Sequence, residues 1–399
     1  MERRNFLQYL SALTGGTLAG GLLTESHQEN HNGSDHHQLQ DHTIESIEFR
    51  DVKLQYPRLV GKNSYKGIHG RGPTINVSIL KTDKGASGWG IARGGGDYLK
   101  NSTEYVKGKK ITDVFDPGQG IIDDKALPFD IALHDLSGII LDIPVYEMLG
   151  RNEPFTTNCY SGMIYFDELG AESLSAGMDK ILEECQYDID HGYRQLKVKI
   201  GRGSKWMDHD EGLQRDIEVT KMIDEHFPEI DILVDANNGY SVEDTIAYLE
   251  GIGDIKLFWF EEPFNENREN YLELRKWMLD HGIETFLADG EYQPDQDLLR
   301  SLYRQRLLDV HLTDIIGLSF SRWRQLMPQL VEMGISASPH CWGSQLKTYY
   351  TAHLCGGLGN MPTIEGVTCT SGDVDFGKYE LEEGILTPSP DPGFGMELI

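Results

Sequence analysis

From residue 152 onward the chain alternates short apolar runs of strand length with longer amphipathic stretches of helix length. Seven βα repeats followed by a final strand, over roughly 210 residues, are typical of a closed parallel β/α barrel. The sequence therefore predicts an α/β fold, a (β/α)7β barrel, over residues 151–399. The expected strands are 156–161, 195–199, 231–235, 257–261, 285–288, 308–312, 335–338 and 363–365.

A doubly wound open sheet is the competing architecture for such a repeat. It would normally carry a glycine-rich GxGxxG turn after its first strand. The nearest candidate, Gly201 and Gly203, follows the second strand and lacks the third glycine. We therefore favour the barrel.

Residues 44–150 show a different pattern. Apolar residues alternate or cluster at strand length over 44–54 and 74–81, with turn residues 82–85 before a short third run, which indicates an antiparallel meander. A polar, glycine-rich loop, 62–72, separates the first two strands and is of the kind that contacts ligands. A helical pattern over 130–141 follows, so the segment predicts a small α+β domain.

Residues 1–43 read as a targeting segment rather than as part of the fold. Arg3 and Arg4 precede a short, weakly apolar run, 9–23, as in a twin-arginine export signal. Residues 24–43 are polar and histidine-rich, and we interpret them as a tether. The alternative is a cytoplasmic enzyme with a frayed N-terminal helix. No run of 18 apolar residues exists, so we expect no membrane-spanning helix.

Charge and cysteine content exclude several function classes. The net charge is −28 and no basic patch is visible, which argues against a nucleic-acid partner. The 5 cysteines are widely spaced and form no CxxC pair, so neither a disulfide framework nor a cysteine zinc site is expected.

Ionisable residues follow the predicted strands from the second to the eighth. In a parallel barrel the chemistry lies at the carboxyl ends of the strands, so these groups are expected to share one mouth. Their spacing of 23 to 36 residues corresponds to one βα unit each. The groups are Lys197 and Lys199, Asp235, Glu261, Glu291, Asp314, His340 and Glu365.

Asp235, Glu261 and Glu291 are the candidate metal ligands. Three carboxylates on adjacent strands make an oxygen-rich site for a hard cation, and Mg²⁺ prefers such ligands. Any one of them could be an ordinary surface carboxylate, but three in register favour a site. Glu262 and Asp289 are close enough in sequence to be confused with them, and strand alternation should turn Glu262 away.

Two candidate bases flank that site. Lys197 and Lys199 should project into the barrel beside the cation, which would lower the pKa of a desolvated lysine. His340 is the second candidate, and Asp314 on the neighbouring strand could fix its tautomer. A plain hydrogen-bonded core pair is the structural alternative for His340 and Asp314.

The ordered set of motifs resembles the enolase superfamily, specifically its mandelate racemase-like branch. The segments that carry the resemblance span about residues 44–399: 82–90, 130–146, Lys-x-Lys at 197–199, Asp-Ala-Asn at 235–237, Glu-Glu-Pro at 261–263, Gly-Glu at 290–291 and Pro-His at 339–340. The resemblance implies that residues 44–150 cap the barrel, that the C-terminal segment returns to this cap, and that the protein is a homo-oligomer. Segments 314–323 and 339–343 look most like acid-sugar dehydratases, although Ser319 and Cys341 depart from the usual glycine and asparagine.

The resemblance also implies residue roles. Asp235, Glu261 and Glu291 match the Mg²⁺ ligands, Lys199 one base, and His340 with Asp314 the other. Lys197 and Asn237 match positions that hold the substrate carboxylate. Glu365 matches an acid that donates to the enolate oxygen, for which it must be protonated. In the cap, Arg58, Lys62, Lys66 and Arg71 could clamp a second carboxylate, although each could equally be a solvated loop charge.

The implied reaction is Mg²⁺-dependent removal of the proton α to a carboxylate. Dehydration of an acid sugar to a 2-keto-3-deoxy acid is favoured, with a small-molecule carboxylate as substrate. Racemisation or epimerisation by the same two bases is the alternative. A sugar-acid binding protein that had lost catalysis is a third alternative. It would lack one of the bases or metal ligands, and none is missing from this sequence. Metal-dependent hydrolysis is weaker still, because it would use several metal-binding histidines and only His340 among the strand ends is a histidine.

Overall fold

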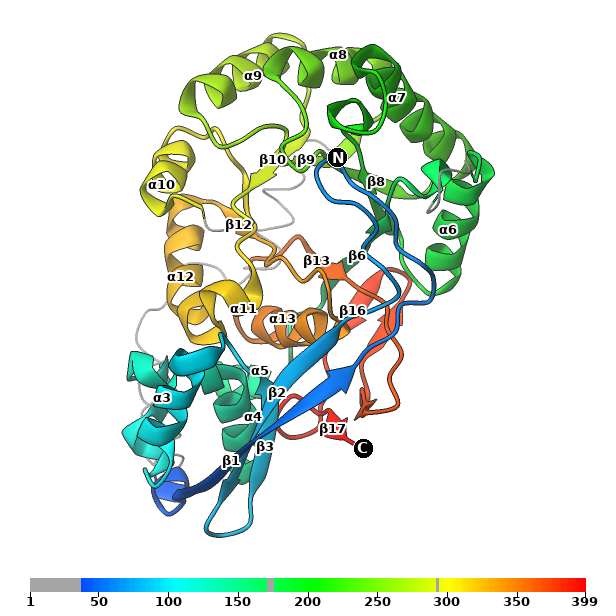
Figure 1. The fold of residues 1–399 in the computed structure, drawn as a ribbon. Helices are drawn as coiled ribbons and strands as arrows, with labels where there is room; N and C mark the ends of the chain where they lie inside the picture. Colours follow the sequence, from blue (N-terminus) through cyan, green and yellow to red (C-terminus); the bar gives the residue numbers. More distant parts are fainter. Residues whose placement is uncertain (1–36, 171–175, 292–293) are drawn as a thin grey trace.

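A computed structural model describes residues 37–170, 176–291 and 294–399 (Figure 1). Its centre is a parallel sheet of eight strands. Strands that are consecutive in the chain lie next to each other, as in a barrel, whereas the strand order of a doubly wound sheet reverses at one point. The eight strands are β6 (Thr157–Ile164), β7 (Gln195–Lys199), β8 (Asp231–Asp235), β9 (Leu257–Glu261), β10 (Phe286–Asp289), β11 (Val310–His311), β12 (Ser336–Ala337) and β13 (Thr363–Gly366).

The two ends of this strand series come together. β13 pairs in parallel with β6, the first strand, over Thr363–Gly366. Beside it, the Ala337 N–H of β12 donates to the Asn360 carbonyl, 3.0 Å away, just before β13. No ladder joins β12 directly to β13 among the described residues. The predicted α/β barrel architecture is confirmed, and the strands lie within a few residues of the expected ranges.

Helices ring the outside of this sheet (Figure 1). Alternation along each strand decides which side chains face them: in β7, Leu196 and Val198 pack toward the helices, while Lys197 points inward. The interior holds a small apolar layer that includes Leu233 and Trp259. The helices are α6 (Asp179–Asp190), α7 (His209–His226), α8 (Val242–Ile252), α9 (Arg268–Asp280), α10 (Gln296–Arg304), α11 (Ile315–Leu318), α12 (Phe320–Met333) and α13 (Gln345–Leu358).

The N-terminal part is an antiparallel three-stranded sheet with helices, which Figure 1 draws in blue and cyan below the barrel. Helix α4 packs so closely on β3 that a Cβ on Gly88 would lie 2.3 Å from the Leu136 backbone, which explains the glycine there. The elements are β1 (Ile44–Lys53), β2 (Thr74–Thr82), β3 (Ser87–Ile91), α3 (Gly96–Val106), β4 (Phe115–Asp116), β5 (Gly120–Ile121), α4 (Asp130–Leu141) and α5 (Val145–Met148), with 3-10 turns at Ile111–Asp113 and Asp124–Phe129.

The C-terminal segment contacts both parts. Strand β16 (Ile385–Thr387) pairs antiparallel with β6, and β15 (Glu380–Glu382) lies outside it. Farther on, β17 (Glu397–Leu398) pairs with β14 (Val374–Asp375). The buried Asp135 of α4 accepts backbone N–H bonds from Trp89 and Phe394, each 2.9 Å long. The tail therefore ties the N-terminal sheet and helix together.

The predicted export signal, residues 1–23, lies outside the described residues, as does most of the predicted tether. Among the helices that the structure does describe, none is both long enough and apolar enough to cross a membrane.

Candidate active site

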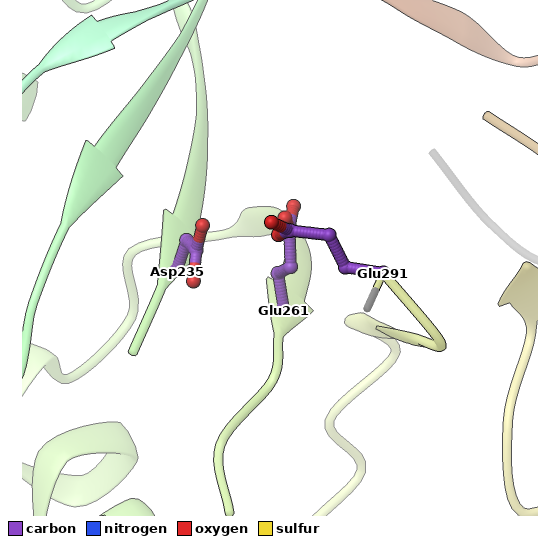
Figure 2. A group of neighbouring side chains, drawn as sticks. All are labelled: Asp235, Glu261 and Glu291. Atoms are coloured by element: carbon purple, nitrogen blue, oxygen red, sulfur yellow. The ribbon is translucent and has the colours of Figure 1, made fainter. Parts of the chain in front are cut away.

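Three carboxylates meet where β8, β9 and β10 end (Figure 2). Asp235 and Glu261 are the last residues of β8 and β9, and Glu291 follows β10. One oxygen from each lies within 4.8 Å of the others. The Oε2 atoms of Glu261 and Glu291 are buried and have no hydrogen-bond partner among the described residues. Such an all-oxygen set with unsatisfied acceptors fits a hard divalent cation.

The neighbouring acids Glu262 and Asp289 behave differently from each other. Asp289 follows the inward-facing Ala288, points outward and accepts hydrogen bonds from the Tyr271 hydroxyl and Gly290 N–H. Glu262 leaves the strand at φ 41° and accepts a hydrogen bond from the Asn237 amide, 3.3 Å away. It stays outside the group of three carboxylates, so the candidate ligands remain Asp235, Glu261 and Glu291. Burial and the charges of Glu291 and Asp235 raise the pKa of Glu262 well above its usual value.

Lys197 and Lys199 project from β7 into this cluster. The Lys197 ammonium lies 2.8 Å from Glu261, 2.9 Å from Glu365 and 3.5 Å from Asp235. Lys199 donates to Asp235. Burial by itself lowers the pKa of Lys199, but the charges of Asp235, Glu291 and Glu261 together outweigh it and raise that pKa. The lowered pKa expected for a lysine beside a bound cation stays a prediction about the metal-loaded site.

His340 faces the triad from the other side. Its Nε2 lies 3.0 Å from Glu291, and its Nδ1 lies 3.1 Å from Asp314. Burial lowers the pKa of His340, but the charges of Glu291, Glu365 and Asp314 raise it above 6.5 overall. These carboxylates therefore stabilise the imidazolium, the form that a proton donor requires.

Asp314 is held by more than His340. Burial raises the pKa of Asp314, but Lys347, 2.7 Å away, and His340 hold it well below its usual range. Its Oδ1 also accepts the N–H groups of Ile316 and Gly317 at the start of α11. The aspartate is thus a fixed anion that orients the imidazole.

Glu365 lies between cations and backbone donors. Burial raises its pKa, but Lys197 and His340 bring it down to about 2. Its Oε2 accepts the backbone N–H groups of Cys341 and Trp342, at 2.6 and 2.8 Å. These contacts fix the His340 loop and favour the carboxylate form, and the donor role expected for Glu365 toward a bound substrate stays a prediction.

Asn237 is likewise engaged with protein groups rather than open to a substrate carboxylate. Its amide nitrogen lies 3.3 Å from both Asp235 and Glu262, and its Oδ1 accepts from Asn63 at 2.9 Å. Its backbone N–H donates to Asp235. Asn237 therefore orients a candidate ligand and anchors the loop 62–72 of the N-terminal part.

The predicted carboxylate clamp is not assembled. Arg58 forms a two-pronged ion pair with Asp188, both contacts at 2.8 Å, so its charge is already neutralised away from the triad. The Lys62 ammonium lies over the Trp206 ring, 5.1 Å from its centroid. Lys66 and Arg71 are exposed.

Residues beyond the predicted set also reach the site. Tyr165 follows β6, and the Lys199 ammonium lies 5.3 Å from its ring centroid. The ring of Tyr165 packs against His69 and Trp342, with centroids 4.7 and 5.0 Å apart. The strand-end rule, applied to the first strand as well as the other seven, would have pointed to Tyr165. His69 and Lys347 carry no comparable sequence signal.

The fold and site together define a class: parallel β/α barrel enzymes with a triad of acidic ligands between two candidate bases. The Enolase C-terminal domain-like family model matches residues 180–399, and the chain belongs to this family.

Similar proteins include several dehydratases. An arabinonate dehydratase from Saccharolobus solfataricus is 26% identical over 261 residues, 65% of this chain and 63% of that protein. A D-xylonate dehydratase from Haloferax volcanii is 21% identical over 83% of this chain and 84% of that protein. A galacturonate dehydratase structure from Geobacillus sp. has a TM-score of 0.83 at 29% identity and covers 90% of this chain and 95% of its own.

Proposed function

We propose that this protein is a Mg²⁺-dependent acid-sugar dehydratase that converts a sugar acid into a 2-keto-3-deoxy acid or the equivalent product. The observation that carries the proposal is the placement of Lys199 and the His340–Asp314 pair on either side of the Asp235, Glu261 and Glu291 triad. Two proton-transfer groups at one carboxylate-lined site are what α-proton abstraction followed by loss of a β-hydroxyl needs.

The relatives support this choice. The Geobacillus structure holds D-galacturonate and 5-keto-4-deoxy-D-galacturonate, a pair that differs by loss of water next to the carboxylate. A mutant of that enzyme was solved with Mg, and a related Geobacillus protein was solved with magnesium and tartrate. Asp235, Glu261 and Glu291 are the residues that would hold Mg²⁺ here.

The chain's own groups divide the work as follows. Either Lys199 or His340, whichever faces the α-carbon hydrogen, breaks the C–H bond and takes the proton. When bound, Mg²⁺ supplies positive charge that stabilises the resulting anion and favours the neutral form of Lys199. His340 as imidazolium then protonates the leaving β-hydroxyl, which departs as water. Asp314 holds the imidazole in place through both steps. The enol product tautomerises to the keto acid.

Racemisation or epimerisation is the second candidate, because bases on two sides could remove a proton from one face and return it to the other. An N-succinylamino acid racemase from Thermus thermophilus and a D-galactarolactone cycloisomerase from Agrobacterium fabrum are among the relatives, at 27% and 24% identity. The dehydratase hypothesis is preferred because dehydratases are among the relatives, and because the carboxylates around His340 stabilise the imidazolium that a leaving hydroxyl needs.

A single experiment tests both. The purified protein is incubated with Mg²⁺ and a panel of sugar acids in D₂O, and 2-keto acid formation and α-deuterium incorporation are followed together. Keto acid that disappears in Asp235→Asn and His340→Asn variants supports the dehydratase. Deuterium uptake without keto acid favours the racemase or epimerase. Neither signal across the panel overturns both.

A further inference from the structure

The wall of the site next to the loop 62–72 contains two polar atoms that the chemistry above does not use. They are the hydroxyl of Tyr165 and the Nε2 of His69. The two rings contact each other edge to face, at 4.7 Å between centroids. Trp342, two residues after His340, packs against both rings and stacks on Tyr56. One aromatic group therefore spans the barrel and the N-terminal part.

Tyr165 lies beside the charged groups, with the Lys199 ammonium 5.3 Å from its ring centroid. The residue is 1% exposed. Burial raises the pKa of this phenol well above 10, and the charges that act on it belong to Lys197, Glu365, Asp235 and Glu291. Those four groups come from four different strand ends, so the phenol lies next to the groups that the proposed reaction uses.

The imidazole of His69 has a defined tautomer. Its Nδ1 lies 2.7 Å from the Gly61 carbonyl, which can only accept, so Nδ1 carries the hydrogen. Burial lowers the pKa of His69 to about 4, so the ring is neutral. Nε2 is left as a lone-pair acceptor, with no partner in the described ranges. Lys66 and Lys199 are near enough for their charges to act on this ring.

The neutral acceptor Nε2 of His69 and the phenol of Tyr165, packed against aromatic rings, are suited to bind the hydroxyl groups of a ligand and not a carboxylate. A second carboxylate would set its lone pairs against that of Nε2 and would need a cation. Of the cations predicted to clamp a second carboxylate, Arg58 pairs with Asp188 and Lys62 covers Trp206. Lys66 acts on His69 through its charge, but its side chain is solvent-exposed.

We propose that Tyr165 and His69 form a hydroxyl-recognising wall, and that the substrate is a polyhydroxy monocarboxylate whose far end carries hydroxyl groups rather than a second carboxylate. This inference rests on the proposed function and narrows it to one substrate class. Tyr165 donates to or accepts from one hydroxyl, and His69 Nε2 accepts from another.

The test uses the Mg²⁺-loaded enzyme and a pair of acids that share their stereochemistry and differ only at the far carbon. D-Galactonate and galactarate are one such pair, and the pair chosen contains the most active member of the panel. We expect kcat/KM for the monoacid to exceed that for the diacid by at least about 10-fold, because an unpaired buried polar group is costly.

Three variants isolate the wall. His69→Phe keeps the ring contact and removes the acceptor, so it should lower kcat/KM for the monoacid by about 10-fold and leave the diacid nearly unchanged. His69→Gln retains an acceptor oxygen and should recover part of the loss. Tyr165→Phe should also lower kcat/KM for the monoacid. Thermal unfolding of each variant shows that it is folded.

Tyr56→Phe is the matched control. Tyr56 belongs to the same aromatic group, but its hydroxyl donates to the Gly343 carbonyl, so its loss should leave the monoacid-to-diacid ratio unchanged. Preference for the diacid, or an unchanged ratio in folded His69→Phe, overturns this inference alone. Absence of turnover and of deuterium exchange with every acid overturns the proposed function, and the inference with it.

Discussion

The Nδ1 atom of His340 and the ammonium of Lys347 share one oxygen of Asp314, at 3.1 and 2.7 Å. The other oxygen of that carboxylate receives two backbone N–H groups from α11. Asp314 is therefore fixed from both sides, and the orientation of His340 depends on the position of α11.

Arg93 of the N-terminal part contacts this same turn. Its guanidinium donates to the carbonyls of Ile316 and Gly317, at 3.1 and 2.9 Å. We expect Arg93→Ala to lower kcat by about 10-fold with little change in KM, because a small displacement of a proton-transfer group is costly. Steady-state kinetics measure this. Arg322→Ala removes a neighbouring ion pair with Asp124 that does not touch α11, and should leave kcat unchanged; equal losses in both variants would contradict the prediction.

Removal of one triad carboxylate should abolish metal binding. We expect Glu261→Gln to lose Mg²⁺ affinity and to lower activity by about 10²-fold or more, and we expect chelation with EDTA to have the same effect on the parent protein. Isothermal titration with Mg²⁺ measures the affinity. Asp289→Asn is the control, since Asp289 binds Tyr271 and not the triad. Unchanged Mg²⁺ affinity in Glu261→Gln would remove this residue from the ligand set.

The two bases should act on different faces of the α-carbon. Lys199→Met and His340→Asn should each lower the rate of α-deuterium exchange by about 10² to 10⁴-fold, but for substrates of opposite configuration at that carbon. Nuclear magnetic resonance in D₂O follows the exchange for each epimer. Equal losses of exchange rate for both epimers in both variants would show that Lys199 and His340 act in a single proton-transfer relay and not on opposite faces of the α-carbon.

Buried histidines should make the fold sensitive to acid. Burial lowers the pKa of His353 and of His311 to about 3, against about 6.5 in the unfolded chain. Above pH 6.5 both states are neutral and the full stability is present. Below pH 6.5 only the unfolded chain gains protons, so each histidine removes about 1.4 kcal/mol per pH unit from the free energy of unfolding.

The measurement is urea unfolding at pH 7.5 and at pH 5.5. His353→Gln should lose about 1.4 kcal/mol less than the parent between these two pH values. His226→Gln replaces an exposed histidine and should lose as much as the parent. The idea fails if His353→Gln shows the parent's full pH dependence.

The twin-arginine pattern predicts export. A variant with Arg3→Lys and Arg4→Lys should stay in the cytoplasm of a bacterium in which the parent chain is exported, because the pair of arginines is what such signals present. Cell fractionation followed by immunoblotting measures the distribution. Identical distributions of the parent and the variant would favour the cytoplasmic alternative.

Sequence patterning was sufficient to predict the barrel and its strand-end groups. Alternation along β7 places Lys197 and Lys199 on one face, and the regular spacing of βα units brings Asp235, Glu261 and Glu291 to one mouth. These relations are local. They depend on the period of two residues along a strand and on the length of each βα repeat, and both can be taken directly from the sequence.

Partners distant in the chain were decided only by the tertiary structure. Arg58 and Asp188 are 130 residues apart, yet their ion pair removes Arg58 from the clamp predicted for it. Asn237 meets Asn63 across 174 residues, and their hydrogen bond joins the barrel to the loop 62–72. The amino-acid sequence determined which groups could reach the site, because strand periodicity is a local property. Tertiary packing decided which of these groups remain available to a ligand, because a buried charged or amide group forms a hydrogen bond or ion pair with the partner that the fold places beside it.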